Sequence, residues 1–138
     1  MTARDERTAC EEFSARYAVP ATDVAAAIEQ RVIGAVWGAN GYTTLDQADE
    51  LAARLDLAPG TTVLDVGTGR GWPGLYYAAR YGCRVVGTDM PVDALAAATD
   101  RARTERVDSQ FSAVAAAGAY QPFRPGSFDA VVHTDVLC

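Results

Sequence analysis

The chain lacks the features of a membrane protein or a metal-rich protein. None of its apolar runs approaches the ~20 residues that a bilayer-spanning helix needs. Its three cysteines, Cys10, Cys83 and Cys138, are far apart and have no metal-ligand spacing, so we expect reduced thiols and no bound metal. The charged N-terminus, MTARDERTACEE, has no apolar signal core. These observations favour a cytoplasmic protein that does not associate with membranes.

Positive charge is also scarce. The 138 residues include 12 basic and 18 acidic side chains, which give a net charge of −6 and a pI of about 4.6. This balance opposes tight binding to nucleic-acid backbones, so we expect no nucleic-acid partner. The remaining composition, 49% hydrophobic and 22% charged, is that of an ordinary globular chain that can bury one core.

Helical signals dominate the first part of the chain. A charged helix is expected over 4–18, broken by Pro20. Thr22 can cap a second helix, which we expect to end at 38–41. The second helix has an apolar stripe formed by Val24, Ile28, Val32 and Val36.

A third helix is indicated by Thr44 and Gln47, which form a capping-box pattern. Its inward face is predicted to consist of Leu45, Ala48, Leu51, Ala52 and Leu55. Together these helices make up a segment over 1–58, which precedes a core over 59–138 within a single domain.

Strand and helix patterns alternate in the core. The predicted strands are 61–66, 83–88, 110–115 and 128–133. The predicted helices are 72–81 and 91–105, with Pro91 at the first helical position. The alternation predicts an α/β fold in which right-handed crossovers build a parallel sheet with helices on both faces.

The most informative run is VLDVGTGRGWPG, followed by VVGTDMP. The first strand reaches Asp65, and Gly67, Gly69 and Gly71 then allow a tight turn and a close approach to a ligand. The next strand ends near Asp89, an acid suited to a ribose diol. Because the carboxyl ends of parallel strands share one edge of a sheet, these residues predict a nucleotide-cofactor site there.

Three motifs resemble those of the class I S-adenosylmethionine-dependent methyltransferases, especially those that act on small molecules. VLDVGTGRG resembles their first motif, VVGTDMP their second, and PFRPGSFDAVVHTDVL the segment leading into their fourth strand. The resemblance covers about residues 40–138 and implies a Rossmann-like parallel sheet of about four strands in the order 3-2-1-4, with N-terminal helices across the cofactor side. It also implies methyl transfer from S-adenosyl-L-methionine to a small-molecule nucleophile, with no catalytic residue assigned.

The resemblance implies roles for the glycine-rich run. Gly67, Gly69 and Gly71 would line the methionine portion of the cofactor. Asp65 would organise this loop and the cofactor's amino group, although it could equally serve only to brace the loop.

The resemblance also implies roles for four residues outside that run. Asp89 would accept hydrogen bonds from the ribose hydroxyls, with an N-cap for the helix at Pro91 as the alternative. Met90 would lie against adenine. His133 would offer its backbone carbonyl to the methionine amino group, with a packing role or a general-base role as alternatives. Tyr42 would close over the cofactor unless it is a packed aromatic residue.

Two features depart from the family's pattern. Ala117 stands where family members often carry an acid that binds the adenine amino group. The family sheet has seven strands and this chain supplies four, so we expect a truncated methyltransferase core. Its last strand, 128–133, would then be an open edge that favours self-association.

Other side chains are expected to be structural. Trp72 and Tyr76 are predicted to lie in the core, and Cys83 to be an inert small hydrophobe. Asp135 could cap a helix.

Two other functions compete with methyl transfer. The run from Gly69 to Gly74 fits GxGxxG and Asp89 follows Gly69 by 20 residues, as in NAD(P)-dependent oxidoreductases. That interpretation requires the first strand to run past Gly67, which leaves the earlier glycine unexplained. A non-catalytic methyltransferase-like fragment is the third hypothesis.

Overall fold

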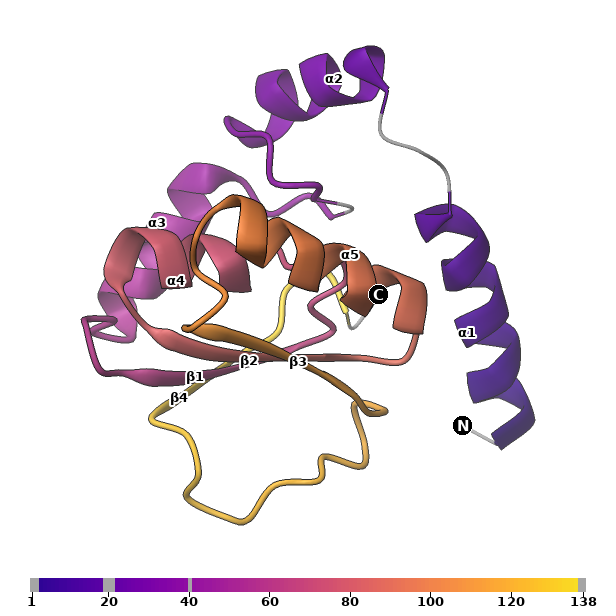
Figure 1. Ribbon diagram of the computed structural model, residues 1–138. Helices are drawn as coiled ribbons and strands as arrows, with labels where there is room; N and C mark the ends of the chain where they lie inside the picture. Colours follow the sequence, from indigo (N-terminus) through magenta and orange to yellow (C-terminus); the bar gives the residue numbers. More distant parts are fainter. Residues whose placement is uncertain (1–2, 19–21, 40, 137–138) are drawn as a thin grey trace.

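A computed structural model of the chain describes residues 3–18, 22–39 and 41–136 (Figure 1). Three helices precede the sheet: α1 (Ala3–Tyr17), α2 (Asp23–Ile33) and α3 (Leu45–Arg54). The remaining elements alternate in the order β1 (Thr62–Val66), α4 (Gly74–Tyr81), β2 (Arg84–Asp89), α5 (Val92–Thr104), β3 (Phe111–Ala115) and β4 (Ala130–Val132). Pro20, Asn40 and Cys138, which entered the sequence-based expectations, lie outside the described residues.

The four strands form one parallel sheet in the order β3-β2-β1-β4, which confirms the predicted order and fold class. Asp65 on the central strand pairs with Gly87 of β2 on one side and with Val132 of β4 on the other. This register aligns the ends of β1, β2 and β4 at one edge of the sheet. Any ligand that uses residues after these strands must therefore bind at that edge.

Helices α3, α4 and α5 lie on one face of the sheet and no helix of the described residues covers the other, whereas helices on both faces were expected. Figure 1 shows α3, α4 and α5 on the same side, and the connection over 116–129 crossing the other side without a helix. The reason is topological. The crossovers from β1 to β2 and from β2 to β3 step in the same direction, so their right-handedness places α4 and α5 on the same face.

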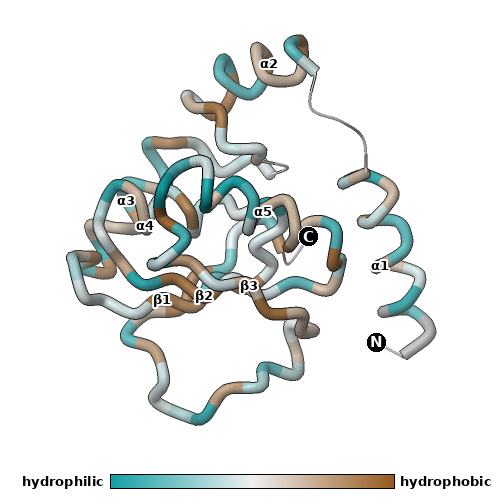
Figure 2. The backbone as a smooth tube through the Cα atoms, viewed as in Figure 1, coloured by the Kyte–Doolittle hydropathy of each residue, from teal (hydrophilic) through white to brown (hydrophobic). Residues whose placement is uncertain are grey.

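The core lies between this helical layer and the sheet. Its fully buried side chains include Val63 and Val85 from the strands and Leu75 and Tyr77 from α4. Ala48 of α3 belongs to the same cluster, and Figure 2 shows apolar segments at the three labelled strands. The core thus contains residues from both sides of position 58, and the predicted division of the chain there stays a prediction. Trp72, Tyr76 and Cys83 are buried, as expected from the sequence.

The N-terminal helices begin where the sequence predicted. Thr22 accepts a hydrogen bond from the Ala25 N–H, and Thr44 and Gln47 form the predicted capping box. The predicted end of α2 is wrong, because Gly34 adopts φ 90° and its N–H bonds to the Gln30 carbonyl. A left-handed glycine in this position ends a helix.

The apolar stripe of α2 exists, but it faces solvent. Val24, Ile28 and Val32 are 69%, 59% and 55% exposed, and the buried residue of this helix is Ile33. Figure 1 shows α2 standing away from the sheet and from α5.

Most boundaries in the core differ by one or two residues from the predicted ones. Gly71 has φ 102°, outside helical space, so α4 begins only at Gly74. Pro91 is the N-cap of α5 rather than its first helical residue. Strand β4 is limited to Ala130–Val132, and Asp129 just before it bonds to Thr62 of β1 through both its N–H and its carboxylate.

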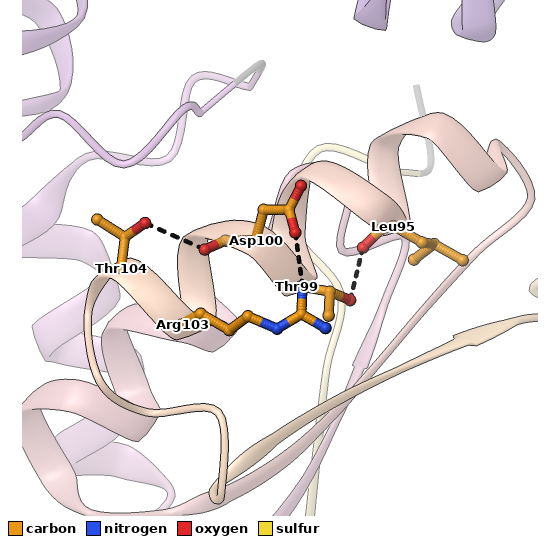
Figure 3. A network of polar contacts seen from close by, with 5 residues as sticks. All are labelled: Leu95, Thr99, Asp100, Arg103 and Thr104. Atoms are coloured by element: carbon orange, nitrogen blue, oxygen red, sulfur yellow. Dashed lines mark hydrogen bonds and ion pairs between the residues drawn. The ribbon is translucent and has the colours of Figure 1, made fainter.

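Helix α5 places its small side chains against the sheet and its polar ones outward. Ala94, Ala98 and Ala102 are almost fully buried. On the polar side, shown in Figure 3, Arg103 pairs with Asp100 at 2.7 Å and the Thr99 hydroxyl donates to the Leu95 carbonyl at 2.9 Å. The helix thus fixes the segment that follows Asp89.

Candidate functional site

The glycine loop between β1 and α4 forms the floor of the candidate site. Gly67, Gly69 and Gly71 all have positive φ, at 74°, 54° and 102°. The N–H groups of Gly67 and Thr68 both donate to the Thr88 carbonyl, at 2.7 and 3.0 Å, which joins the loop to β2. The left-handed conformations explain the glycines, because residues with a β-carbon adopt them at a cost of about 1–2 kcal/mol. Strand β1 ends at Val66, so it does not run past Gly67 as a GxGxxG dinucleotide site would require.

Asp65 lies beneath this loop and braces it. The side chain is 1% exposed, and its Oδ2 accepts hydrogen bonds from the Thr68 hydroxyl at 2.7 Å and from the Gly74 N–H at 3.1 Å. Burial raises the pKa of Asp65 to about 7, although both hydrogen bonds oppose the shift. The structure therefore shows the bracing contacts, with the carboxyl group covered by the protein.

Asp89 joins the end of β2 to the glycine loop. Its Oδ2 accepts from the Gly69 N–H and its Oδ1 from the Met90 N–H, both at 2.8 Å. Burial raises the pKa of Asp89 above its ordinary value, against the lowering effect of these two donors. The N-cap alternative is wrong, since Pro91 caps α5 and no side chain bonds to the cap.

A cavity of about 260 Å³ opens beside the glycine loop. Its walls come from four places: α1, the segment after α2, the glycine loop and the segment after β4. Its lining residues are Phe13, Arg16, Tyr17, Gly38, Gly41, Gly67, Thr68, Gly69, Arg70, Trp72, Thr134 and Asp135.

The wall formed by α1 was not predicted residue by residue. The Tyr17 hydroxyl lies so close to the loop that a β-carbon on Gly69 would be 2.7 Å from it. Arg70 donates to the Tyr17 carbonyl and lies over the Tyr17 ring, 5.6 Å from its centroid. Arg16 lies 5.5 Å from the centroid of Phe13, one helical turn earlier. The only available signal was the i, i+3, i+4 spacing of these aromatic and basic residues.

The segment between α2 and α3 is held over the cavity by Glu29 and Arg101. Glu29 Oε1 accepts from the N–H groups of Trp37 at 2.6 Å and Ala39 at 2.9 Å. Arg101 of α5 donates to the Val36 carbonyl at 3.0 Å. No local sequence pattern indicated these anchors.

Asp135 holds the other end of this segment. Its Oδ2 accepts three hydrogen bonds: from the N–H of Tyr42 at 3.0 Å, and from the N–H and hydroxyl of Thr43 at 3.1 and 2.8 Å. Gly41 packs so closely that a β-carbon there would lie 2.1 Å from the same oxygen. The expected capping role of Asp135 is replaced by this bridge between the N-terminal segment and the end of β4.

Tyr42 and His133 face a second opening. They line a neighbouring cavity of about 510 Å³ with Gln47, Glu50, Leu51, Arg54 and three residues around the bridge. Tyr42 is 84% exposed. The structure thus places Gly67, Gly69 and Asp89 together through hydrogen bonds to β2, whereas His133 and Tyr42 line the second cavity.

Four further residues named from the sequence do not line this cavity: Asp65, Gly71, Asp89 and Met90. Asp89 reaches it only through its hydrogen bond to Gly69. Gly71 faces the core, where a β-carbon would lie 2.3 Å from Leu75 Cδ1. Met90 is half-buried beyond Asp89.

Ala117 lies just after β3, beside Gln121, whose Nε2 donates to the Ala117 carbonyl at 2.9 Å. Gln121 Oε1 is buried and has no hydrogen-bond partner in the described structure.

No group of three His, Cys, Asp or Glu side chains in the described part of the chain could hold a metal ion. None of the described helices is both long and apolar enough to cross a membrane.

Comparison with known proteins identifies the family. The methyltransferase domain family matches residues 63–138, more than half of the chain. The chain belongs to this family.

Several members are similar in sequence or structure to this methyltransferase domain. Methyltransferase GfsG of Streptomyces halstedii is 35% identical over 83 residues, which are 60% of this chain and 30% of GfsG. Phosphoethanolamine N-methyltransferase 1 of Arabidopsis thaliana is 30% identical over 108 residues, 78% of this chain and 21% of that enzyme. The structure also superposes with a TM-score of 0.62 on geranyl diphosphate C-methyltransferase of Streptomyces coelicolor, at 26% identity, covering 86% of this chain and 42% of that one. The methyltransferase domain described here thus spans less than half the length of these relatives.

Proposed function

We propose that this chain binds S-adenosyl-L-methionine at the glycine loop and supports methyl transfer to a small-molecule acceptor. The observation that carries the proposal is the hydrogen bond from the Gly69 N–H to the Asp89 carboxylate. It fixes a side-chain-free turn and an acid together at the carboxyl edge of the sheet, beside a cavity. The geranyl diphosphate methyltransferase was crystallised with S-adenosyl-L-homocysteine, which supports the same ligand here.

The residues present fit such a cofactor. Gly67 and Gly69 line the cavity without side chains of their own. Val136 and the Tyr17 hydroxyl lie where their β-carbons would be, so these two groups must move aside for the methionine portion to approach the backbone closely. Each carboxylate oxygen of Asp89 accepts one hydrogen bond from the protein. Because a carboxylate can accept about four hydrogen bonds, Asp89 can still accept one from each ribose hydroxyl. Gln121 Oε1, buried and unpartnered beside Ala117, is an acceptor available near the end of β3.

When bound, S-adenosyl-L-methionine supplies an electrophilic methyl group on a sulfonium. The chain's own contribution is then orientation and the exclusion of water. Asp65 keeps the loop in one conformation through Thr68 and Gly74. Tyr17 and the segment anchored by Glu29 close the cavity from the other side. Met90 is proposed to lie against adenine, while the proposed contacts of His133 and Tyr42 require the ligand to reach the second cavity.

A small-molecule acceptor is the finer part of the proposal. Two similar proteins are named for phosphoethanolamine and geranyl diphosphate, both small molecules.

Self-association through β4 is a second part of the proposal. This strand is an edge of the described sheet, and Val131 is 54% exposed on it. Val131→Lys should lower the sedimentation-average mass at high concentration, whereas Val92→Lys, at a similarly exposed residue on α5, should not. An equal effect of the two changes would contradict pairing through β4.

A cytoplasmic location likewise stays a prediction, to be checked by cell fractionation.

Calorimetric titration of the purified chain with S-adenosyl-L-homocysteine and, separately, with NADH tests the main proposal. We expect the former to bind more tightly. Asp89→Ala should weaken its binding by about 1.5–3 kcal/mol, because hydrogen bonds to a charged acceptor are lost. Asp108→Ala removes an exposed carboxylate away from the cavity and should leave the affinity unchanged. Tighter binding of NADH, or unchanged binding by Asp89→Ala, would refute the assignment.

A further inference from the structure

The charged side chains that line the cavity beside the glycine loop sum to the opposite sign from the whole chain. The protein carries a net charge of −6, yet these side chains are two arginines, Arg16 and Arg70, and one aspartate, Asp135. Asp89 bonds to the Gly69 N–H but does not itself line the cavity. The arginines come from opposite walls, one from α1 and one from the glycine loop. A concave site with an excess of positive charge attracts anions.

The lining aspartate is already occupied by other donors. Asp135 Oδ2 accepts three hydrogen bonds from Tyr42 and Thr43, as described above. Its charge thus stabilises the segment between α2 and α3.

Aromatic rings rather than acids hold the arginine on the outer wall. The Arg16 guanidinium lies over Phe13 at 5.5 Å and forms no ion pair with a described carboxylate. Phe13 in turn stacks against Tyr17, with centroids 6.4 Å apart, and Arg70 lies over Tyr17. Ring contacts orient a guanidinium but leave its charge and its in-plane N–H donors for a planar anion.

We infer that the methyl acceptor of this site carries a phosphate or carboxylate group, and that Arg16 is the residue that selects for it. The inference rests on the proposed function and names the class of its acceptor. The methionine portion of S-adenosyl-L-methionine carries a sulfonium, an ammonium and one carboxylate, so its net charge is positive. Two arginines would disfavour this net charge unless a further anion shared the cavity. An anionic acceptor would balance the charge of the two arginines beside the cationic cofactor. Arg16 would select for such an acceptor through bidentate hydrogen bonds to its phosphate or carboxylate group.

Binding of inorganic pyrophosphate to the full chain saturated with S-adenosyl-L-homocysteine tests this inference. Trp72 lines the cavity, so its fluorescence reports occupancy. We expect saturable binding in the wild type. It should be weaker by at least about fivefold in Arg16→Gln, because a charge-assisted pair is lost. Arg7→Gln is the matched control, since Arg7 is an exposed arginine of the same helix outside the cavity lining. It should change the affinity by less than about twofold.

The outcomes separate this inference from the proposed function. If S-adenosyl-L-homocysteine itself does not bind the wild type, the proposed function fails. If it binds but pyrophosphate does not, or if both variants bind pyrophosphate equally well, the anionic-acceptor assignment fails alone. A third arm compares S-adenosyl-L-homocysteine with 5′-methylthioadenosine, which lacks the amino-acid carboxylate. If Arg16→Gln weakens only the former and leaves pyrophosphate binding intact, Arg16 serves the cofactor's carboxylate and the assignment is overturned.

Discussion

The Gly69 N–H donates to Asp89 Oδ2 at 2.8 Å, which ties the glycine loop after β1 to the end of β2. The two residues are 20 positions apart in the chain and lie at the ends of adjacent strands. This contact gives Asp89 a role in the protein before any ligand binds. The loop is held in the conformation that exposes its backbone to the cavity.

The first prediction concerns this contact in the ligand-free protein. Asp89→Ala removes the acceptor for the Gly69 and Met90 N–H groups, so we expect the free energy of unfolding to fall by about 1–3 kcal/mol. Amide hydrogen exchange should accelerate at Gly69 in particular. Asp108→Ala should alter the unfolding free energy by less than about 0.5 kcal/mol. Unchanged exchange at Gly69 would show that the carboxylate does not anchor the loop.

The second prediction separates backbone strain from close packing at glycine. Gly126 has φ 77° with no heavy atom within 4 Å of an added β-carbon, so Gly126→Ala should cost only the left-handed conformation, about 1–2 kcal/mol. Gly71 has φ 102°, and its added β-carbon would lie 2.3 Å from Leu75 Cδ1. Gly71→Ala should therefore cost about 2–5 kcal/mol, because overpacking adds to strain. Urea denaturation measures both, and equal costs would contradict the packing argument.

The third prediction concerns the pH dependence of stability through Asp65. Its pKa is raised from 3.8 to about 7, so the folded chain holds this proton more tightly than the unfolded chain does. The stability contributed by this group is thus fully present at low pH and is lost as the pH rises through about 7. Asp65→Asn abolishes the titration while its amide oxygen can still accept from Thr68 and Gly74.

The expected result is a pH-dependent difference between the two proteins. The unfolding free energy of Asp65→Asn relative to wild type should increase by on the order of 2 kcal/mol between about pH 5 and about pH 8. Asp49 and Asp129 also have shifted pKa values, but they titrate in both proteins and cancel in the difference. The charge of Asp89 is one cause of the raised pKa of Asp65, so its effect belongs to the difference that is measured. Asp108→Asn serves as the control. Parallel pH curves for wild type and Asp65→Asn would exclude a raised pKa at this position.

The fourth prediction concerns the bridge between Thr43 and Asp135. Thr43→Val removes the 2.8 Å hydrogen bond to the carboxylate and keeps the side-chain shape, so it should lower stability by about 1 kcal/mol. Thr104→Val removes a hydroxyl that bonds to the Asp100 carbonyl on the exposed side of α5, and should have an effect close to zero. Thermal denaturation compares the two. Asp135→Ala should lower stability more than either threonine change, because it removes all three hydrogen bonds of the bridge. A smaller loss of stability in Asp135→Ala than in Thr43→Val would contradict the bridge.

The strand order followed from the resemblance of three motifs to those of the methyltransferases. The sequence by itself determined the positions of the strands, the glycine loop and the N-caps of α2 and α3. These features depend on local signals: period-two and period-3.6 patterns, capping residues, and glycines where φ must be positive. The predicted end of α2 was wrong although Gly34 marks the true end. The apolar spacing continues past this glycine to Val36, so the pattern predicted a longer helix than the structure contains.

Only the tertiary structure decided which residues meet at the cavity. The bond between Tyr42 and Asp135 spans 93 positions and the contact between Arg70 and Tyr17 spans 53, and no periodic pattern encodes pairings at such separations. Helix α1 therefore could be predicted as a helix, but not as the wall that brings Arg16 to the glycine loop. His133 and Tyr42 follow predicted elements, yet the bridge directs them to the second cavity. Asp65 acquires its raised pKa from burial, which arises only when α4 and the glycine loop close over the end of β1.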